Sequence, residues 1–522
     1  MLFAYFIGLI ICVSAIVCLS DSVSVFFNSL LLSGVYWEHL LWFDVLTVFI
    51  LLMLLVCYGY AFFYTDHYFS GDSAGYELSK IIFLFVSVMA TLVLTGDFLS
   101  TLVLWEYLGV VSFFLILFYS NYLSLRSSVV TLVSSRFGDV CLFLIIAVSY
   151  FSGFPSYVTL CLFFFVIMTK SASFPFISWL LEAMRAPTPV SSLVHSSTLV
   201  AAGVWFSMRY DFNYFFSDLL PFLLILSLTI FVTGVCCFFF LDLKKIVALS
   251  TCNNVSWCIV YLLFGDVTLS LFQLVSHGVS KCLLFMLVGD VMSGTGGSQA
   301  SNCVYVPRLY GNWGLFGLFS VVLGLSGAPF IGVFFTKHFL LSTFSVGLNI
   351  VIYSFIVFCV FLSYFYSFRL CSVLSSLNAS VPSGVIFAFN SGIMVYFWLT
   401  LNFFIASSLD ESTSVGSLTS VLLISFQVLS CFTAYFLYSS TLLSSWSSSL
   451  FGCDNVVESC YLLFMNIGKN VQLFFFRWDN YVIALLNGNG VSILQTYLSS
   501  VINFIILSLF VFLMCWFILY NY

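Results

Sequence analysis

Charged residues are scarce in this 522-residue sequence, which has 14 lysines and arginines and 20 aspartates and glutamates, or 7% of the chain. A soluble globular domain carries about 25% charged residues, and these form its polar shell. Because 62% of the residues are hydrophobic, the polar shell needed to cover such a core in water is missing. The low charge therefore excludes a soluble globular protein.

Motifs for metal, redox and nucleotide chemistry are also absent. The 17 cysteines include no C-x-x-C pair, which argues against a zinc site, an iron–sulfur cluster or a disulfide framework. No G-x-G-x-x-G follows a strand, and there is no Walker-type loop or H-E-x-x-H. We expect no cofactor and no metal in this chain, so energy for any transport must come from a partner subunit or an ion gradient.

Apolar runs of 18 or more residues recur along the chain, and each is long enough to cross roughly 30 Å of hydrocarbon as a helix. Helices also satisfy their backbone hydrogen bonds within the segment, as lipid requires. The sequence predicts an all-α polytopic bundle of about 15–16 spans. The spans are expected near 1–20, 41–63, 79–97, 98–120, 129–151, 157–172, 190–209, 219–241, 246–264, 268–292, 312–327, 330–367 (two helices), 385–406, 417–440 and 501–520.

Two predicted helices are interrupted close to a lysine. Pro175 follows Lys170, and its ring removes the helical partner of the Ser171 carbonyl. Pro329 ends a Gly-Ala-Pro sequence eight residues before Lys337. Paired broken helices indicate a transport site at membrane depth, because free carbonyls are tolerated there only beside protein or water. A packing kink is the alternative for each break.

Four charged residues lie within apolar runs of the first half. A charge at mid-bilayer costs on the order of 2.5–3.5 kcal/mol, so such residues tend to be paired, hydrated or functional. Glu106 and Lys170 have opposite signs, and if they face one another they form a coupled pair that can hold and release a proton. Arg136 and Asp139 are spaced as an intrahelical pair. A purely structural ion pair is the alternative in both cases.

Titratable residues also form polar faces on two later helices. His195 shares a face with Ser191, Ser192 and Ser196, which indicates a hydrogen-bonded water file or, alternatively, a histidine satisfied by its serines. Gln273, His277 and Lys281 recur every four residues, and such a stripe can carry a proton over about two helical turns.

Charges near the ends of spans have simpler interpretations. Asp242, Lys244 and Lys245 open a span and are expected to reach the membrane surface. Asp454, Glu458, Lys469 and Asn480 fall on one side of a helix drawn through residues 441–500, which predicts an amphipathic helix along a membrane or partner surface.

The run KSASFPFISWLLEAMRAPTPVSSLVHSSTLVAAGVWFSMR closely resembles the core of the chain 5 family of NADH–ubiquinone oxidoreductase, respiratory complex I. DLKKIVALST, SHGVSKCLLF and LGLSGAPFIGVFFTKHFLL match further blocks in the family's order, so the similarity covers roughly residues 80–345. The resemblance implies a proton-translocating module of the mitochondrial inner membrane, whose energy comes from NADH oxidation and ubiquinone reduction in other subunits. It also implies that NADH, FMN, iron–sulfur clusters and ubiquinone bind to those partners. No nucleic-acid partner is expected.

The resemblance assigns roles to the polar residues already described. Glu106 and Lys170 become the coupled pair, His195, His277 and Lys281 continue the hydrophilic axis, and Lys337 is the exit-side lysine. The chain departs from the family at Leu104 and Tyr107 beside Glu106, at Gln273 in place of a second histidine, and at His338 in place of an aspartate.

The resemblance divides the chain into terminal helices around a translocating core. Residues 1–78 form N-terminal helices, 79–345 the antiporter-like core, and 346–440 C-terminal helices. Residues 441–500 form a lateral helix toward neighbouring antiporter-like subunits, and 501–522 form an anchor. Alternatives to this function are a chain of a multisubunit Na⁺/H⁺ antiporter and a structural membrane scaffold.

Overall fold

The structure is a computed structural model of the full chain. It describes residues 23–32, 35–151, 157–210, 219–294, 297–301, 303–304, 306–307, 311–328, 333–347, 349–375, 379–380, 417–438, 453–484, 501 and 503–514.

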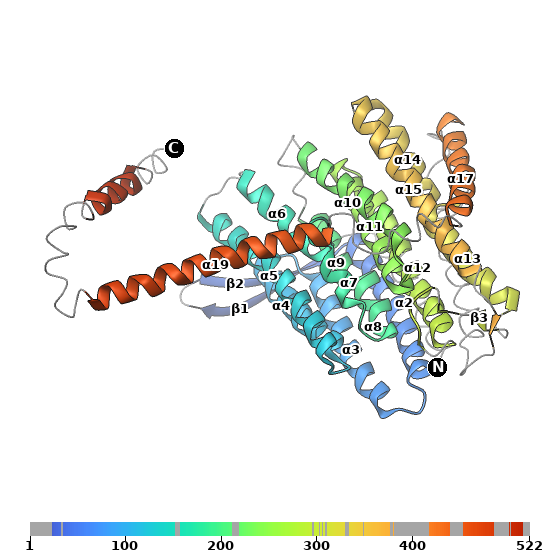
Figure 1. Cartoon of the computed structure of the whole chain (residues 1–522), viewed down its shortest axis with the longest axis horizontal. Coiled ribbons are helices and arrows are strands. Elements are labelled where there is room, and N and C mark those ends of the chain that lie inside the picture. The colour runs from blue at the N-terminus through green and yellow to red at the C-terminus, as the bar shows by residue number, and fades with distance from the viewer. Residues whose placement is uncertain are drawn as a thin grey trace. The chain divides into compact units, whose positions relative to one another are not determined.

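Helices dominate the described residues, and ten of them are long and apolar enough to cross a membrane (Figure 1). The helices of the first half are α2 (Val45–Tyr68), α3 (Ser73–Leu94), α4 (Phe98–Leu117), α5 (Tyr122–Phe151), α6 (Tyr157–Lys170), α7 (Ser178–Ala183), α8 (Thr188–Leu193), the π-helix η1 (Val194–Thr198) and α9 (Leu199–Arg209). Those that follow are α10 (Leu220–Phe239), α11 (Leu243–Leu263), α12 (Val267–Ser293), α13 (Gly311–Ser326), α14 (Val333–Gly347), α15 (Ile350–Ser375), α17 (Ser417–Tyr438) and α19 (Cys453–Ala484).

The predicted polytopic helical fold is confirmed, and most predicted spans match a helix within a few residues. The range 330–367 contains two helices, α14 and α15, as expected. The spans near 1–20 and 385–406 lie outside the described residues, so the total of about 15–16 spans stays a prediction.

An antiparallel hairpin precedes α2, where the sequence was expected to contain only helices and connections. Its strands are β1 (Val23–Leu32) and β2 (Val35–Phe43), and Val23 pairs with Phe43. The hydrophobic run 41–63 was read as one span, but its first residues belong to β2. Two short strands, β3 (Val306–Pro307) and β4 (Ala379–Ser380), pair in parallel.

Burial separates the central helices from those at the edge of the bundle. The most apolar windows of Thr188–Arg209 and α12 are 100% buried, and that of α11 is 94% buried, whereas the window of α3 is 33% buried. In Figure 1, α11 lies between α10 and α12, and it packs against both. Because α3 is equally apolar yet exposed, its outer face suits lipid.

A buried arginine ties α15 to the end of α10. The two terminal nitrogens of Arg369 donate to the carbonyls of Cys237 at 2.5 Å and Phe240 at 3.0 Å. Helix-terminal carbonyls have no partner within their own helix, so this side chain caps α10.

We expect Arg369→Met to lower the free energy of unfolding by roughly 2–4 kcal/mol, because buried carbonyls lose charge-assisted hydrogen bonds. Thermal unfolding of the purified protein in lipid nanodiscs measures the change. The matched control is Arg126→Met, since Arg126 is exposed on α5. Equal melting temperatures for the two variants would contradict the capping role.

The C-terminal residues Asn455–Tyr522 form a separate compact unit. Helix α19 runs through 32 residues, and almost all its described side chains are exposed, apolar and charged ones alike. A helix within 441–500 is therefore confirmed, whereas its course along a membrane stays a prediction.

Candidate functional site

The first predicted break is present, and it places Lys170 at the end of α6. The chain turns through residues 171–177 before α7 begins at Ser178. Ala172 has φ +54° in this turn, an unfavourable conformation for a residue with a Cβ. The Trp179 indole donates to the Thr169 carbonyl at 3.0 Å, so part of the opened helix end is satisfied from across the break.

The Lys170 amine is buried, and none of the described residues forms a hydrogen bond with it. Its Nζ lies 5.1 Å from the centre of the Trp105 ring. Gly203 of α9 allows this packing, because a Cβ there would come within 3.1 Å of the Ile167 carbonyl oxygen. The protein thus holds a buried lysine that has a cation–π contact and no hydrogen-bond acceptor among the described residues.

Three charged residues surround this lysine and form a cluster of four with it. Arg136 forms an ion pair with Glu106, and its Nη1 also lies 3.5 Å from Oδ2 of Asp139. Both carboxylates interact electrostatically with Lys170, Asp139 more strongly than Glu106. Glu106 therefore interacts with Lys170 electrostatically while its ion pair is with Arg136, and the predicted Arg136–Asp139 pair is confirmed.

His195 lies in a π-helical turn that interrupts the span Thr188–Arg209. Single π-turns are rare and frequently occur at functional sites. The helix starts at Thr188 between Pro187 and Pro189, residues that suit a first helical turn. Ser191 and Ser192 are buried, but their hydroxyls donate to carbonyls of their own helix, so the alternative of a histidine satisfied by serines is wrong. Neither ring nitrogen of His195 has a regular hydrogen-bond partner in the described part of the chain.

Lys170 and His195 line the same small cavity, with Trp179 and several serines and threonines around it. Its volume of about 10 Å³ is near the minimum that one water molecule needs. A water there would have an amine, an imidazole and hydroxyl groups as partners. Lys170 and His195 thus face a common space of about the size of one water molecule.

The stripe on α12 is fully buried, as an internal polar path requires. The Lys281 amine donates to the Ser250 hydroxyl, and the Val247 carbonyl lies 3.5 Å away. His277 has no hydrogen-bond partner on either ring nitrogen among the described residues. Thr336 donates to the Gln273 side chain at 2.9 Å, which connects the stripe to α14.

The second break separates α13 from α14 and holds Lys337. Gly327 ends α13 with φ +90°, and an added Cβ would lie 3.2 Å from the Phe334 nitrogen, so glycine is required. The Lys337 amine donates to the Ser326 carbonyl at 2.6 Å and to the Ser363 hydroxyl at 2.7 Å. Pro329 lies outside the described residues, but the interruption between Ser326 and Val333 is as predicted.

His338 points to a different neighbour from Lys337. Its Nε2 lies 2.8 Å from the Thr419 hydroxyl of α17. Gln427 of the same helix donates to the Gly327 carbonyl at 2.7 Å, so α17 also supports the break.

The sequence interpretation misplaced one buried titratable group, Lys244, and missed another, Asp290. Lys244 was expected at the surface, but it is 4% exposed and donates to the Ala186 carbonyl at 3.4 Å, whereas Lys245 pairs with Asp242 near the surface. Asp290 is buried, and its Oδ1 lies 3.8 Å from Nε2 of His67. Asp290 is a lone charge in an apolar run, the same signal that identified Glu106.

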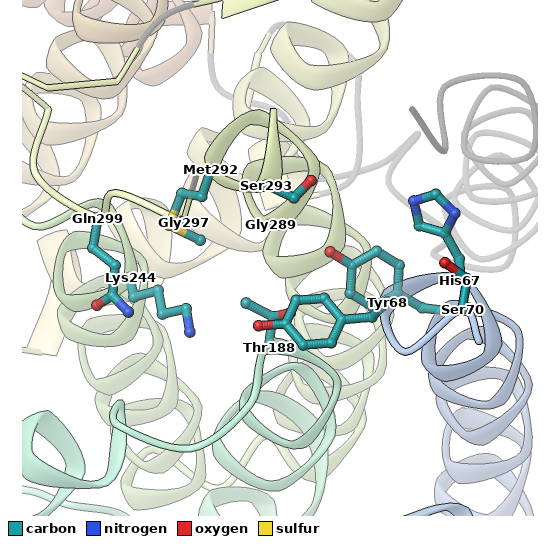
Figure 2. Close-up of a pocket in the computed structure, with 11 residues that line it drawn as sticks. His67, Tyr68, Ser70, Thr188, Lys244, Gly289, Met292, Ser293, Gly297 and Gln299 are labelled. Carbon is teal, nitrogen blue, oxygen red and sulfur yellow. The ribbon is translucent and has the colours of Figure 1, made fainter. Parts of the chain in front are cut away.

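Lys244 and His67 line a second cavity of about 500 Å³ (Figure 2). No group of three or more histidine, cysteine, aspartate or glutamate residues that could hold a metal is found in the described ranges. The site therefore consists of buried amines, imidazoles and carboxylates, which are groups that transfer protons.

Comparison with protein families places a range of the chain in a known family. The transmembrane family described as NADH:quinone oxidoreductase/Mrp antiporter matches residues 95–365. This range contains Glu106, Lys170, His195, Lys281 and Lys337.

Curated relatives carry the name NADH-ubiquinone oxidoreductase chain 5. The chain from Aedes aegypti is 33% identical over 63% of this chain and 59% of its own length. The chain from Caenorhabditis elegans is 36% identical over 56% of this chain and 57% of its own length. The chain from Anopheles arabiensis is 33% identical over 57% of this chain and 82% of its own length. The match thus spans about three fifths of the length of the first two relatives.

Two solved structures share the fold. A chain of the Mrp complex from Dietzia sp. is 20% identical with a TM-score of 0.69, covering 88% of this chain and 56% of that one. A chain of the archaeal membrane-bound sulfane sulfur reductase is 16% identical with a TM-score of 0.65, and the match covers 83% of this chain and 91% of that one. At these identities, the likeness supports the antiporter-like helical fold alone.

Proposed function

Because the chain belongs to the NADH:quinone oxidoreductase/Mrp antiporter family, and within it to the relatives named NADH-ubiquinone oxidoreductase chain 5, we propose that it translocates protons as a membrane subunit of respiratory complex I. The observation that carries the proposal is the buried Lys170 amine at a helix break, beside the ion-paired carboxylates of Glu106 and Asp139.

Lys170 serves as the central proton carrier in this proposal. The carboxylates favour its ammonium form and desolvation opposes it, so a change in the nearby charges shifts the balance between proton binding and release. Arg136 sets that balance because it binds Glu106 and lies near Asp139. A shift of 1.4 kcal/mol changes the proton equilibrium about tenfold, so small movements of these side chains suffice.

The released proton moves along the remaining buried groups. His195 shares a cavity with Lys170 and is the next acceptor through a bridging water. His277 and Lys281 extend the path on α12, and Lys337 at the second break is the exit-side group. Gln273 cannot titrate, so it orients the stripe through Thr336 and does not carry the proton itself.

The energy and the redox chemistry come from partners in this proposal. NADH oxidation and quinone reduction occur in other subunits, which bind NADH, FMN, iron–sulfur clusters and ubiquinone. Helix α19 follows neighbouring antiporter-like subunits through its exposed apolar side chains. The location is the mitochondrial inner membrane, as the naming of the relatives suggests.

Sodium–proton exchange in an Mrp-type complex is the second candidate, because one of the similar folds comes from an Mrp complex. Purification of the native complex and its reconstitution into vesicles separates the two. We expect NADH and a quinone to drive proton uptake into inverted vesicles without dependence on sodium. A complex that lacks NADH oxidation and exchanges sodium for protons would contradict the proposal and support the second candidate.

A further inference from the structure

The larger cavity lies between the ends of α2, α8, α11 and α12. Its volume is about 500 Å³, enough for several water molecules. Figure 2 shows Lys244 and Gln299 on one side of this cavity and His67 on the other, with Thr188 and Tyr68 between them. Polar residues of six types therefore line a space at the ends of four helices.

Asp290 lies beside His67, one of the residues that line this cavity. It is 3% exposed, and neither carboxylate oxygen has a hydrogen-bond partner within the described residues. Gly289, the preceding residue, lines the cavity, and His67, which also lines it, has its Nε2 3.8 Å from Asp290 Oδ1. A buried carboxylate without hydrogen bonds is costly, so it requires water or a proton.

Lys244 connects the cavity to the site at the first break. Its amine donates to the Ala186 carbonyl at 3.4 Å, and its charge interacts with His195. His195 in turn shares the smaller cavity with Lys170. A series of titratable groups thus extends from the larger cavity to the central lysine.

We propose that this cavity is a hydrated access vestibule for protons, with Asp290 and His67 as its protonation site. The Asp290 carboxylate accepts a proton from hydronium in the cavity and leaves water behind. It returns the proton to cavity water next to Lys244, from which the path continues to His195. This inference rests on the proposed function and adds an entry branch that starts at Asp290.

Other titratable groups also face this pair, and they determine its pH response. Helix α2 contributes Tyr64 and Tyr68 besides His67, and α11 contributes Lys244. Thr188 of α8 adds a hydroxyl that does not titrate in this range. Within this group, Asp290 and His67 form the pair that exchanges protons with the cavity in this proposal, and the charge of Lys244 faces them from α11.

Asp290→Asn tests the vestibule in the intact complex, because it removes the titratable group and keeps the shape. We expect NADH-driven proton uptake to fall on the order of tenfold at alkaline pH, where protons are scarce, and to change little at acidic pH. The matched control is Asp266→Asn, which makes the same change at the opposite end of α12, where Asp266 occupies the N-cap position without a side-chain hydrogen bond to the helix. Its pH profile should follow that of the parent complex.

Ser293→Cys provides a second test that leaves the Asp290–His67 pair intact. Ser293 lines the cavity and is exposed, so a bulky charged thiol reagent can reach it. We expect labelling to reduce proton uptake. The parent complex is the labelling control, because its Cys303 is already exposed.

Normal pH profiles for Asp290→Asn together with normal pumping after labelling of Ser293→Cys would overturn the vestibule. Equal losses in Asp266→Asn would overturn it as well. If Asp290→Asn fails to assemble, the labelling result decides. The proposed function fails separately. A fully active Lys170→Met complex contradicts proton translocation through this site. An impaired Lys170→Met complex together with normal vestibule variants contradicts the vestibule alone.

Discussion

Lys170→Met should assemble normally and lose proton translocation through this subunit on the order of a hundredfold, because the central titratable group is removed. The lysine has no hydrogen bond to lose within the described residues, and methionine has a similar length. Replacing a buried charge with an apolar side chain also removes a desolvation cost, so the folded protein should tolerate the change. The measurement is NADH-driven proton uptake by reconstituted vesicles, with complex content determined by native gel electrophoresis.

Lys245→Met is the matched control for this prediction. Lys245 makes an ion pair with Asp242 at 3.3 Å, and its side chain is 38% exposed. Exposed ion pairs contribute little, so its removal should leave both assembly and proton uptake close to those of the parent. Equal proton uptake by the two variants would show that Lys170 is not the carrier.

Membrane spans could be predicted from the sequence because each apolar run is a local signal. Helices α10, α11 and α12 begin and end within a few residues of the predicted spans. The β1–β2 hairpin could not be predicted in this way, because β-branched and aromatic residues favour strand and lipid-facing helix alike. Val23 pairs with Phe43, a residue 20 positions further along the chain. A hydropathy pattern describes neighbouring residues and does not predict such a contact.

Buried polar residues were predicted well, but their partners were not. A lone charge in an apolar run identifies Glu106 and Lys170, yet the ion pair of Glu106 with Arg136 joins residues 30 positions apart. Lys244 illustrates the opposite error, since a lysine at the start of a span usually reaches the surface. Here α11 is central in the bundle, and its start is covered by neighbouring helices, so the amine binds the Ala186 carbonyl.

The charge cluster predicts that Arg136→Met will impair proton release from Lys170 and that Glu106→Gln will partly restore it. Arg136, Lys170, Glu106 and Asp139 together balance two positive and two negative charges. Removal of Arg136 leaves two carboxylates near one ammonium, and a charge about 4 Å away interacts by about 4 kcal/mol at the effective dielectric near a protein surface. We expect the single variant to lose at least about tenfold in proton uptake rate, since 1.4 kcal/mol corresponds to tenfold.

The double variant Arg136→Met/Glu106→Gln returns the cluster to one positive and one negative charge, Lys170 and Asp139. Proton uptake should therefore exceed that of Arg136→Met alone, although a second group has been removed. A purely structural ion pair predicts the reverse, because each loss of a hydrogen-bonding group adds damage or leaves it unchanged. The control pair is Arg185 and Glu182, which lie 3.3 Å apart at the end of α7 and whose side chains are 36% and 33% exposed. The double variant Arg185→Met/Glu182→Gln should not exceed Arg185→Met alone in proton uptake. If only the Arg136 pair shows such a recovery of proton uptake, charge balance at Lys170 is its cause.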